Sequence, residues 1–365
     1  MKRLTEFDEL ADPSFSSAVI GWQKSHGRHA LPWQNTRDAY RIWLSEIMLQ
    51  QTQVAAVLGY YARFLERFPT LYDLAAAPQD AVMAQWAGLG YYTRARNLHA
   101  CAIRVVAEYG GVFPTDPARL VELPGIGRST AAAISAFSSG TRAAILDGNV
   151  KRVFARVFGI DQFPGVKAVE DGLWRRANAL LPHDGIESYT QGLMDLGATL
   201  CTRSKPDCAR CPLQQRCVAH ASGRTAELPV RKPKKTIPEK QAAMLLVLNG
   251  AQVLLQQRAQ SGIWGALMSL PEIDGHGVRG AIDALAVDAA ARVFGQVEEV
   301  QALLPLVHVF THYRLHIVPF RVALAERATL PEGYLWWNLA DLERAPLPAP
   351  VKKLLMDIST PSLFT

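Results

Sequence analysis

Four of the five cysteines in this 365-residue chain lie between positions 201 and 217, in the pattern C-x6-C-x2-C-x5-C. Thiolates spaced this closely in a chain with few other cysteines are typical of tetrahedral metal ligation. A pair of disulfides would instead suit a small secreted domain. Zinc ribbons usually offer two C-x2-C pairs, and this segment offers one. The spacing therefore favours an iron–sulfur cluster and leaves zinc open, with the ligands Cys201, Cys208, Cys211 and Cys217.

A glycine-rich segment, Leu123-Pro-Gly-Ile-Gly-Arg-Ser-Thr130, leads into the helix-forming run 131–137. Its two glycines permit a tight turn, and the backbone N–H groups that open the next helix can then bind an anion such as a DNA phosphate. A connection of this kind between helices is often only a loop. We therefore expect a phosphate site at Gly125, Gly127 and Ser129 only where neighbouring motifs support it.

The elements that carry these residues change character along the chain. The first 223 residues show helical periodicity in the segments 40–68, 79–86, 92–109, 129–138, 150–157 and 170–181. Residues 227–238 contain three prolines and four basic residues, which is typical of a semi-rigid linker. Beyond it, β-like runs at 242–248 and 253–257 flank Asn249-Gly250, a hairpin signal, and 315–323 is a further strand candidate.

This pattern predicts a multidomain protein. We expect an all-α domain at 1–223, with a helix-hairpin-helix at about 119–138 and a cysteine loop at 201–217. A basic, proline-rich linker would occupy 224–239, and an α+β domain 240–365.

The charge is distributed unevenly. The net charge is +6 with a pI near 9.1, which permits a polyanionic partner, but residues 241–365 carry nine basic and eleven acidic side chains. The basic excess therefore belongs to the first two-thirds of the chain and the linker. The charged N-terminal residues contain no uninterrupted apolar run, so we expect no export signal, no membrane partner and a cytoplasmic protein.

With these motifs in view, the sequence resembles the helix-hairpin-helix superfamily of DNA glycosylases. A glycine-rich hairpin is followed by Asp147 in Ile-Leu-Asp-Gly-Asn, and Glu46 lies upstream in Trp-Leu-Ser-Glu-Ile. Together with the cysteine quartet after them, these motifs resemble the MutY-type adenine DNA glycosylases over nearly the whole chain. The resemblance implies a base-excision-repair enzyme that removes adenine opposite 8-oxoguanine or guanine in double-stranded DNA. It also implies one 4Fe-4S cluster on the four cysteines; we expect a monomer associated with the nucleoid.

The resemblance assigns the chemistry to two carboxyl groups. Glu46 would protonate adenine at N7 and later assist the attacking water, while Asp147 would stabilise the sugar cation. By pattern alone, Glu46 at the edge of an apolar stripe (Ile47, Val54, Leu58, Tyr61, Leu65) is a surface carboxylate, and Asp147 is a helix N-cap. Further implied site residues, each otherwise explained by core or surface packing, are Asn149 and Lys151 on the sugar side, Trp33 beside the extruded base, and Gln50, Gln51 and Tyr91 as the wedge.

Ser129 occupies the position where related bifunctional enzymes carry a lysine nucleophile. Without an amine there, no efficient Schiff-base route to strand cleavage exists, so we expect a monofunctional enzyme that leaves an abasic site. Arg203 and Lys205, between the first two cysteines, would lie on a loop that the cluster holds rigid. We expect these two side chains to contact the DNA backbone.

The C-terminal domain resembles a Nudix domain through Trp264-Gly-Ala-Leu-Met-Ser-Leu-Pro-Glu272. The corresponding run at 286–295 lacks the closely spaced glutamates that bind Mg²⁺, which argues against a nucleotide hydrolase. Phe310-Thr311-His312 resembles the loop, commonly Phe-Ser-His, with which the family probes 8-oxoguanine. A DNA-binding protein without catalysis is a further alternative, and Glu46 and Asp147 together argue against it.

Overall fold

The computed structural model describes residues 10–232, 237–259, 262–274, 284–310 and 312–359. The chain divides into two compact units, one formed by 1–76 and 97–234 and the other by 77–96 and 235–365. Residues 77–96, which we expected in the helical domain, thus group with the second unit. Part of the expected linker belongs to the first unit, because Leu228 is buried in its hydrophobic core.

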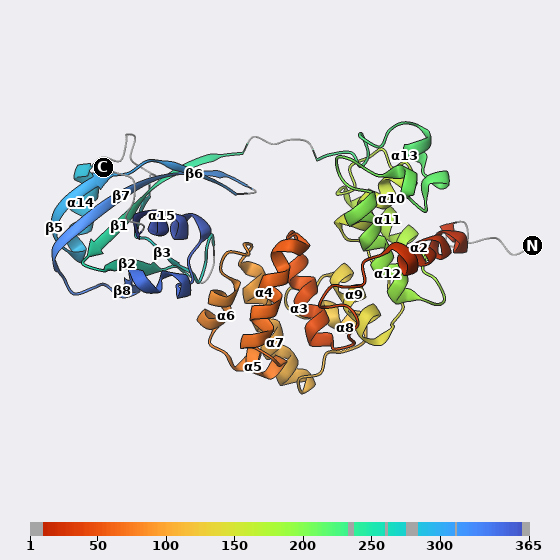
Figure 1. Cartoon of the computed structure of the whole chain (residues 1–365), viewed down its shortest axis with the longest axis horizontal. Helices are drawn as coiled ribbons and strands as arrows, with labels where there is room; N and C mark the ends of the chain where they lie inside the picture. Colours follow the sequence, from red (N-terminus) through yellow and green to blue (C-terminus); the bar gives the residue numbers. More distant parts are fainter. Residues whose placement is uncertain (1–9, 233–236, 260–261, 275–283, 311, 360–365) are drawn as a thin grey trace, which may run out of the picture. The chain divides into compact units, whose positions relative to one another are not determined.

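Helices make up the chain up to residue 221 (Figure 1). Several of them begin at an aspartate whose carboxylate accepts backbone N–H groups of the first turn: Asp12, Asp38, Asp116 and Asp147. The elements are α2 Pro13–His26, α3 Ala39–Leu49, α4 Val54–Arg67, α5 Leu71–Ala76, α6 Gln79–Trp86, α7 Thr93–Tyr109, α8 Pro117–Val121, α9 Arg128–Ser139, α10 Gly148–Val157, α11 Lys167–Ala179, α12 Ile186–Asp195, the π-helix η1 Leu196–Leu200, the short 3-10 helices η2 Cys208–Arg210 and η3 Gln214–Arg216, and α13 Val218–Ala221.

One helical prediction is wrong. The segment 40–68 is not one stretch, because α3 ends at Leu49 and α4 begins at Val54. The break contains neither glycine nor proline, and Gln51 within it has φ +59°, in the left-handed region. The apolar residues expected to form one stripe beside Glu46 therefore lie on two separate helices. One of them, Leu58, is 38% exposed.

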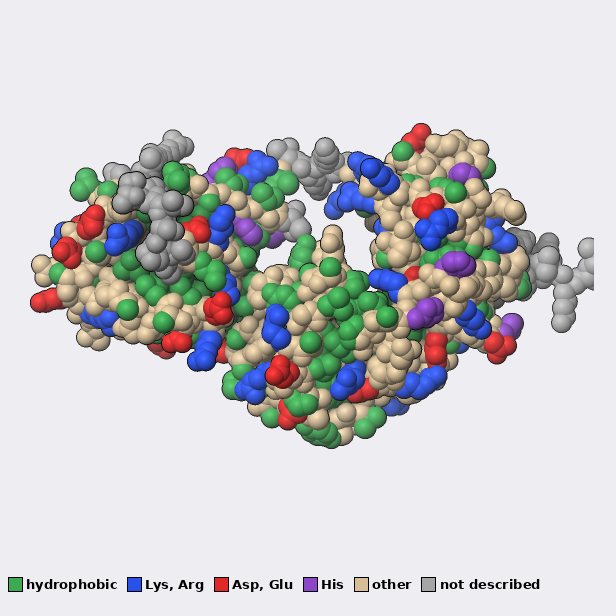
Figure 2. All heavy atoms as spheres, viewed as in Figure 1, with side chains coloured by type: hydrophobic (Ala, Val, Ile, Leu, Met, Phe, Trp, Pro, Cys, Tyr) green, Lys and Arg blue, Asp and Glu red, His purple; other side chains and the backbone are tan. Residues whose placement is uncertain are grey.

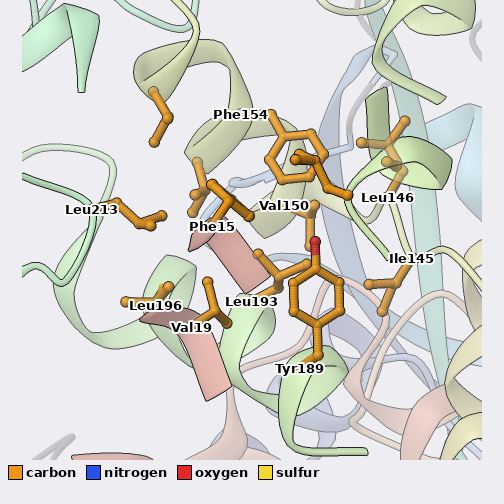
Figure 3. Close-up of a cluster of buried hydrophobic side chains, with 14 of the residues drawn as sticks. Phe15, Val19, Ile145, Leu146, Val150, Phe154, Tyr189, Leu193, Leu196 and Leu213 are labelled. Carbon is orange, nitrogen blue, oxygen red and sulfur yellow. The ribbon is translucent and has the colours of Figure 1, made fainter. Parts of the chain in front are cut away.

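A hydrophobic core in the first unit joins α2, α10 and α12 (Figure 3). Phe15 and Phe154 pack edge to face with ring centroids 5.9 Å apart. Ile145 and Leu146 are also buried there, and each such side chain contributes about 1.5–3 kcal/mol by leaving water. Because these two residues directly precede Asp147, the core fixes the backbone from which that carboxylate projects.

The second unit contains an eight-stranded mixed sheet. β1 and β2 pair across Gly250, which has φ +59°, so the predicted hairpin is confirmed. β1 pairs in parallel with β7, which contains the predicted strand 315–323. The strands are β1 Glu239–Asn249, β2 Gln252–Gln257, β3 Met268–Ser269, β4 Glu272–Asp274, β5 Gly295–Ala302, β6 Leu306–Val309, β7 Arg314–Arg327 and β8 Tyr334–Asn338.

Helices complete the second unit. Val287 and Ala291 of α14 share a core with Leu245 of β1 and Phe320 of β7, so α14 covers one face of the sheet. The helices of this part are α14 Ala284–Ala291, the 3-10 helices η4 Arg292–Phe294 and η5 Leu339–Arg344, and α15 Ala349–Ser359. The expected combination of an all-α part and an α+β part is thereby confirmed.

Among the described residues, no helix is long and apolar enough to cross a membrane. On the face drawn in Figure 2, acidic and basic side chains are interspersed over both units. Net charge alone therefore does not mark a DNA-binding surface on that face.

Candidate functional site

Two cavities in the first unit meet at a shared set of four side chains, Arg28, Trp33, Glu46 and Gln191. The larger cavity has a volume of about 1330 Å³ and contains most of the site residues expected from the sequence. These are Gln50, Gln51, Gly125, Gly127, Ser129, Asp147, Asn149 and Arg203, in addition to Trp33 and Glu46. The smaller cavity, of about 490 Å³, extends from the shared set past Ile42 and Ser45 to Arg37 and Glu187.

Glu46 lies in the last turn of α3 and is half-buried, so it is not the surface carboxylate that pattern alone suggested. The helix is held by the buried side chains of Ile42, Trp43 and Ile47. Burial raises the pKa of Glu46 to about 8, and the negative charge of Asp147 contributes to the same shift. A carboxyl group with this pKa is protonated at neutral pH and can act as a proton donor.

Asp147 serves as the N-cap of α10 and also faces the larger cavity. Its Oδ1 accepts the Val150 N–H at 2.8 Å, and its Oδ2 accepts Asn149 Nδ2 at 3.2 Å. Burial raises the pKa of Asp147, while these hydrogen bonds act in the opposite direction. Upstream, Ser129 Oγ accepts the Leu146 N–H at 3.1 Å, which ties the start of α9 to the backbone before Asp147.

The glycine-rich turn between α8 and α9 also faces the larger cavity. Gly125 has φ +78°, a backbone conformation that favours glycine. A Cβ at this position would also lie 2.9 Å from Asn97 Cβ, which is too close for a side chain. Gly127 is the N-cap of α9. Gln50 reaches this helix start from the α3–α4 break, where its Nε2 lies 3.5 Å from Thr130 Oγ1.

Arg152, which was not among the expected site residues, connects this site to the cysteine segment. Its Nη2 donates to Asn149 Oδ1 at 2.9 Å and to the Gly197 carbonyl at 2.6 Å, and its Nε donates to the Cys201 carbonyl at 2.8 Å. Gly197 lies so close that a Cβ on it would be 2.9 Å from Asn149 Cα. η1, which leads into the cysteine segment, is therefore packed closely against the backbone at the start of α10.

Arg156 organises the cysteine segment from inside the protein, where it is 2% exposed. It donates to the carbonyl oxygens of Leu228 and Thr202, each at 2.7 Å, and its Nη1 lies 3.3 Å from Cys201 Sγ. Burial of this guanidinium is tolerated because its N–H groups donate hydrogen bonds to these acceptors. Its position one turn after Arg152 was the only sequence signal for this role.

The four cysteines form no disulfide with one another and line one small cavity. The π-helix η1 sets up the first of them, since the Cys201 N–H donates to the Leu196 carbonyl at 2.6 Å. Burial and the neighbouring thiols raise the pKa of Cys211 to about 11. No three His, Cys, Asp or Glu side chains in the described part of the chain converge on a single-ion site. A donor set of four sulfurs is the set that an iron–sulfur cluster uses.

Comparisons with known proteins identify two domain families in this chain. Residues 44–179 match the model of the HhH-GPD superfamily of base excision DNA repair proteins, and residues 242–357 match the NUDIX domain. An adenine DNA glycosylase of Buchnera aphidicola is 34% identical over 93% of this chain and 96% of its own length. The human adenine DNA glycosylase is 31% identical over 95% of this chain and 74% of its own length. The chain belongs to the adenine DNA glycosylase family.

Solved structures show the same helical fold. A thermostable thymine-DNA glycosylase is 30% identical, with a TM-score of 0.52 over 57% of this chain and 95% of its own. Endonuclease III in a non-covalent complex with DNA is 21% identical, with a TM-score of 0.50 over 60% of this chain and 99% of its own. The helical part of this glycosylase therefore has the fold of a base-excision enzyme.

Some expected site residues of this glycosylase lie outside the two cavities. Lys151 Nζ forms an ion pair with Glu170 Oε1 at 2.6 Å and lines neither cavity. Tyr91 belongs to the second unit, has φ +49° and is 45% exposed. Lys205 is exposed, and its carbonyl accepts the Thr202 hydroxyl at 2.6 Å. The structure therefore does not gather the whole expected set around Glu46.

In the Nudix-like unit, Phe310 is surrounded by aromatic rings. Its ring centroid lies 5.4 Å from that of Trp264, 4.5 Å from that of His308 and 4.7 Å from that of Tyr313. His312 is 6.1 Å away by the same measure, and Thr311 lies outside the described residues. The ring of Phe310 is therefore packed among aromatic side chains of this unit.

Proposed function

We propose that this enzyme hydrolyses the N-glycosidic bond of adenine paired with 8-oxoguanine, or with guanine, in double-stranded DNA. The observation that carries the proposal is the pairing of Glu46 and Asp147 on one cavity. One carboxyl is protonated near neutral pH, and the other is held in place by the start of α10. Cleavage of an adenine nucleoside needs both an acid for the base and an anion for the sugar.

In the proposed reaction, the flipped adenine enters between Trp33 and Glu46. Glu46 donates its proton to N7 of adenine, and the bond from the sugar C1′ to N9 breaks with both electrons going to the base. The Asp147 carboxylate stabilises the positive charge that develops on the sugar. Water then attacks C1′ and gives its proton to the Glu46 carboxylate, which restores the acid.

The surroundings of Ser129 support a monofunctional reaction. Its hydroxyl is engaged with the Leu146 N–H, and it offers no amine for a Schiff base. Lys151, two residues after Asn149, is paired with Glu170 and lines neither cavity. The product is then an abasic site in an intact strand.

DNA would bind along the larger cavity. The backbone N–H groups at the start of α9 suit a phosphate, and Gln51, held in a left-handed conformation at the cavity wall, suits the place of the extruded base. Gln50, which lines the same cavity, would complete the wedge. Arg203 lines the same cavity, and with Lys205 it would contact the backbone.

The four cysteines would hold a 4Fe-4S cluster. When bound, the cluster supplies a rigid four-thiolate crosslink with redox capacity. Arg156 would donate toward Cys201, and Arg152 would fix the carbonyl of the same residue. In the second unit, Phe310, Thr311 and His312 would recognise 8-oxoguanine opposite the adenine.

A single-turnover assay on duplexes with A:8-oxoguanine and A:G pairs tests the proposal. We expect Glu46→Gln to lower the excision rate by roughly 10²–10⁴-fold, because the amide cannot donate an acidic proton. Strand breaks should appear only after alkali treatment. DNA affinity, measured in parallel, should change little. Near-normal excision by Glu46→Gln would remove the basis of the mechanism.

A further inference from the structure

Asp195 is the last residue of α12 and is 0% exposed, yet it carries a carboxylate. Arg28 satisfies both of its oxygens: the Arg28 backbone N–H donates to Oδ2 at 2.8 Å, and Arg28 Nε and Nη2 lie 2.7 and 2.6 Å from Oδ1. Gln191 Nε2 donates to the same Oδ1 at 2.8 Å. A fully buried acid with this many partners is fixed in position.

Both partners of Asp195 belong to the four side chains that the two cavities share. Arg28 and Gln191 therefore border the space beside Glu46 and Trp33 where the base would enter. Of these two, only Gln191 can offer a hydrogen-bond acceptor, because a guanidinium has donors alone.

The chemistry of a carboxylate decides how Gln191 is turned. An ionised carboxylate only accepts hydrogen bonds, so the amide must direct Nε2 toward Asp195. The opposite side of the amide, Oε1, is then turned away from Asp195. Among the hydrogen bonds of the described residues, none uses Gln191 Oε1. Gln191 Oε1 is thus an acceptor of fixed orientation that is available to a bound base.

We propose that Asp195 is a positioning residue that selects bases with an exocyclic amine at C6, by holding Gln191 with its carbonyl oxygen toward the base. Adenine presents an N–H donor at that position. Guanine and hypoxanthine present a carbonyl oxygen there, which would leave two acceptors facing each other in a partly buried site. The inference rests on the proposed function, and it adds a residue that does not itself touch the base.

The test compares single-turnover removal of adenine and of hypoxanthine, each opposite 8-oxoguanine in the same duplex. Intrinsic differences between the two leaving groups cancel when the ratio of their rates is compared between variants. In Asp195→Asn, the amide oxygen is a weaker acceptor than a carboxylate and the amide nitrogen can face Gln191, so Gln191 is held less firmly in one orientation. We expect the adenine-to-hypoxanthine ratio to fall roughly tenfold, the value of one hydrogen bond.

Two further variants separate this role from a general loss of structure. Gln191→Met should lower the ratio to a similar extent, and the double variant should show no additional fall, since both changes remove one interaction. The matched control is Thr199→Val, which removes the 2.8 Å hydrogen bond to the Asp195 backbone carbonyl and leaves the carboxylate contacts intact. This variant should keep the wild-type ratio.

The outcomes distinguish the two proposals. Wild-type enzyme that leaves adenine in place would refute the proposed function itself. Wild-type enzyme that excises adenine, together with an unchanged ratio in Asp195→Asn or Gln191→Met, would refute only the role of Asp195. Equal slowing of both substrates would likewise reduce Asp195 to a structural residue.

Discussion

At the scale of single residues, two carboxyl groups on one cavity differ because their surroundings differ. Glu46 has no described hydrogen bond to stabilise its charge, and burial dominates its titration. Asp147 is equally enclosed but accepts N–H groups from α10 and Asn149. The first is therefore suited to give a proton, and the second to remain an anion.

This difference predicts the pH dependence of the single-turnover rate. Glu46 must be protonated to act, and since burial raises its pKa to about 8, the rate should stay high at neutral pH and fall about tenfold per pH unit above 8. Asp147 must be ionised, and because burial raises its pKa, the rate should also fall toward acid pH. Rates measured from pH 4.5 to 9.5 with saturating enzyme test both limbs.

The basic limb has a direct control. In Glu46→Gln, the residual rate should lose its decline above pH 8, because the group that titrates there is gone. A wild-type rate that is constant up to pH 9.5 would contradict the assignment of Glu46 as the acid.

Functional residues can be predicted from the sequence when their types and spacing are unusual. The cysteine quartet and the glycine turn are unusual in any chain, so their spacing indicated their grouping. Arg152, Arg156 and Asp195 were missed because a charged residue in a helical pattern is ordinarily on the solvated face. Only the fold shows that these three are enclosed and that each holds a neighbour of the site.

At the scale of elements, the start of α10 at its capping residue Asp147 was predictable, and the break between α3 and α4 was not. The break contains Gln50 and Gln51, which are ordinary helix formers, and the φ of +59° at Gln51 opposes local preference. Backbone strain of this kind persists where the surrounding structure enforces it. A pattern of residue types carries no signal for that enforcement.

The close packing of η1 against α10 leads to a prediction about Gly197. Gly197→Ala should displace Asn149, which donates to Asp147, because the added Cβ would lie within 3 Å of Asn149 Cα and Cβ. We expect a loss of about 1–3 kcal/mol in the free energy of unfolding and a slower excision rate. Thermal melting and single-turnover kinetics measure the two effects.

Gly148→Ala is the matched control for stability. A Cβ on Gly148 meets no atom within 4 Å, and this glycine begins the same helix. It should therefore leave the Tm unchanged or raise it slightly, since alanine restricts the unfolded chain. Equal Tm values for the two variants would show that the contact between η1 and α10 is not tight.

At the scale of the whole molecule, the chain divides its tasks between two units that each have a core of their own. The first unit contains the carboxyl pair, the cysteines and most of the basic excess. Residues 241–365 carry nine basic and eleven acidic side chains and are therefore poorly suited to general attraction of phosphate. They are better suited to a choice between bases, which the aromatic cluster around Phe310 would make.

This division predicts what removal of the second unit's sheet would do. Deletion of residues 239–365 should lower the preference for A:8-oxoguanine over A:G, while excision from A:G continues, because Glu46 and Asp147 remain in the first unit. Phe310→Ala in the full-length chain should lower the same preference and leave the Tm of the first unit unaltered, which separates lost recognition from lost folding. Single-turnover rates on the two duplexes give the preference directly. An unchanged preference in both variants would place the recognition of 8-oxoguanine in the helical unit and leave the Nudix-like unit without that task.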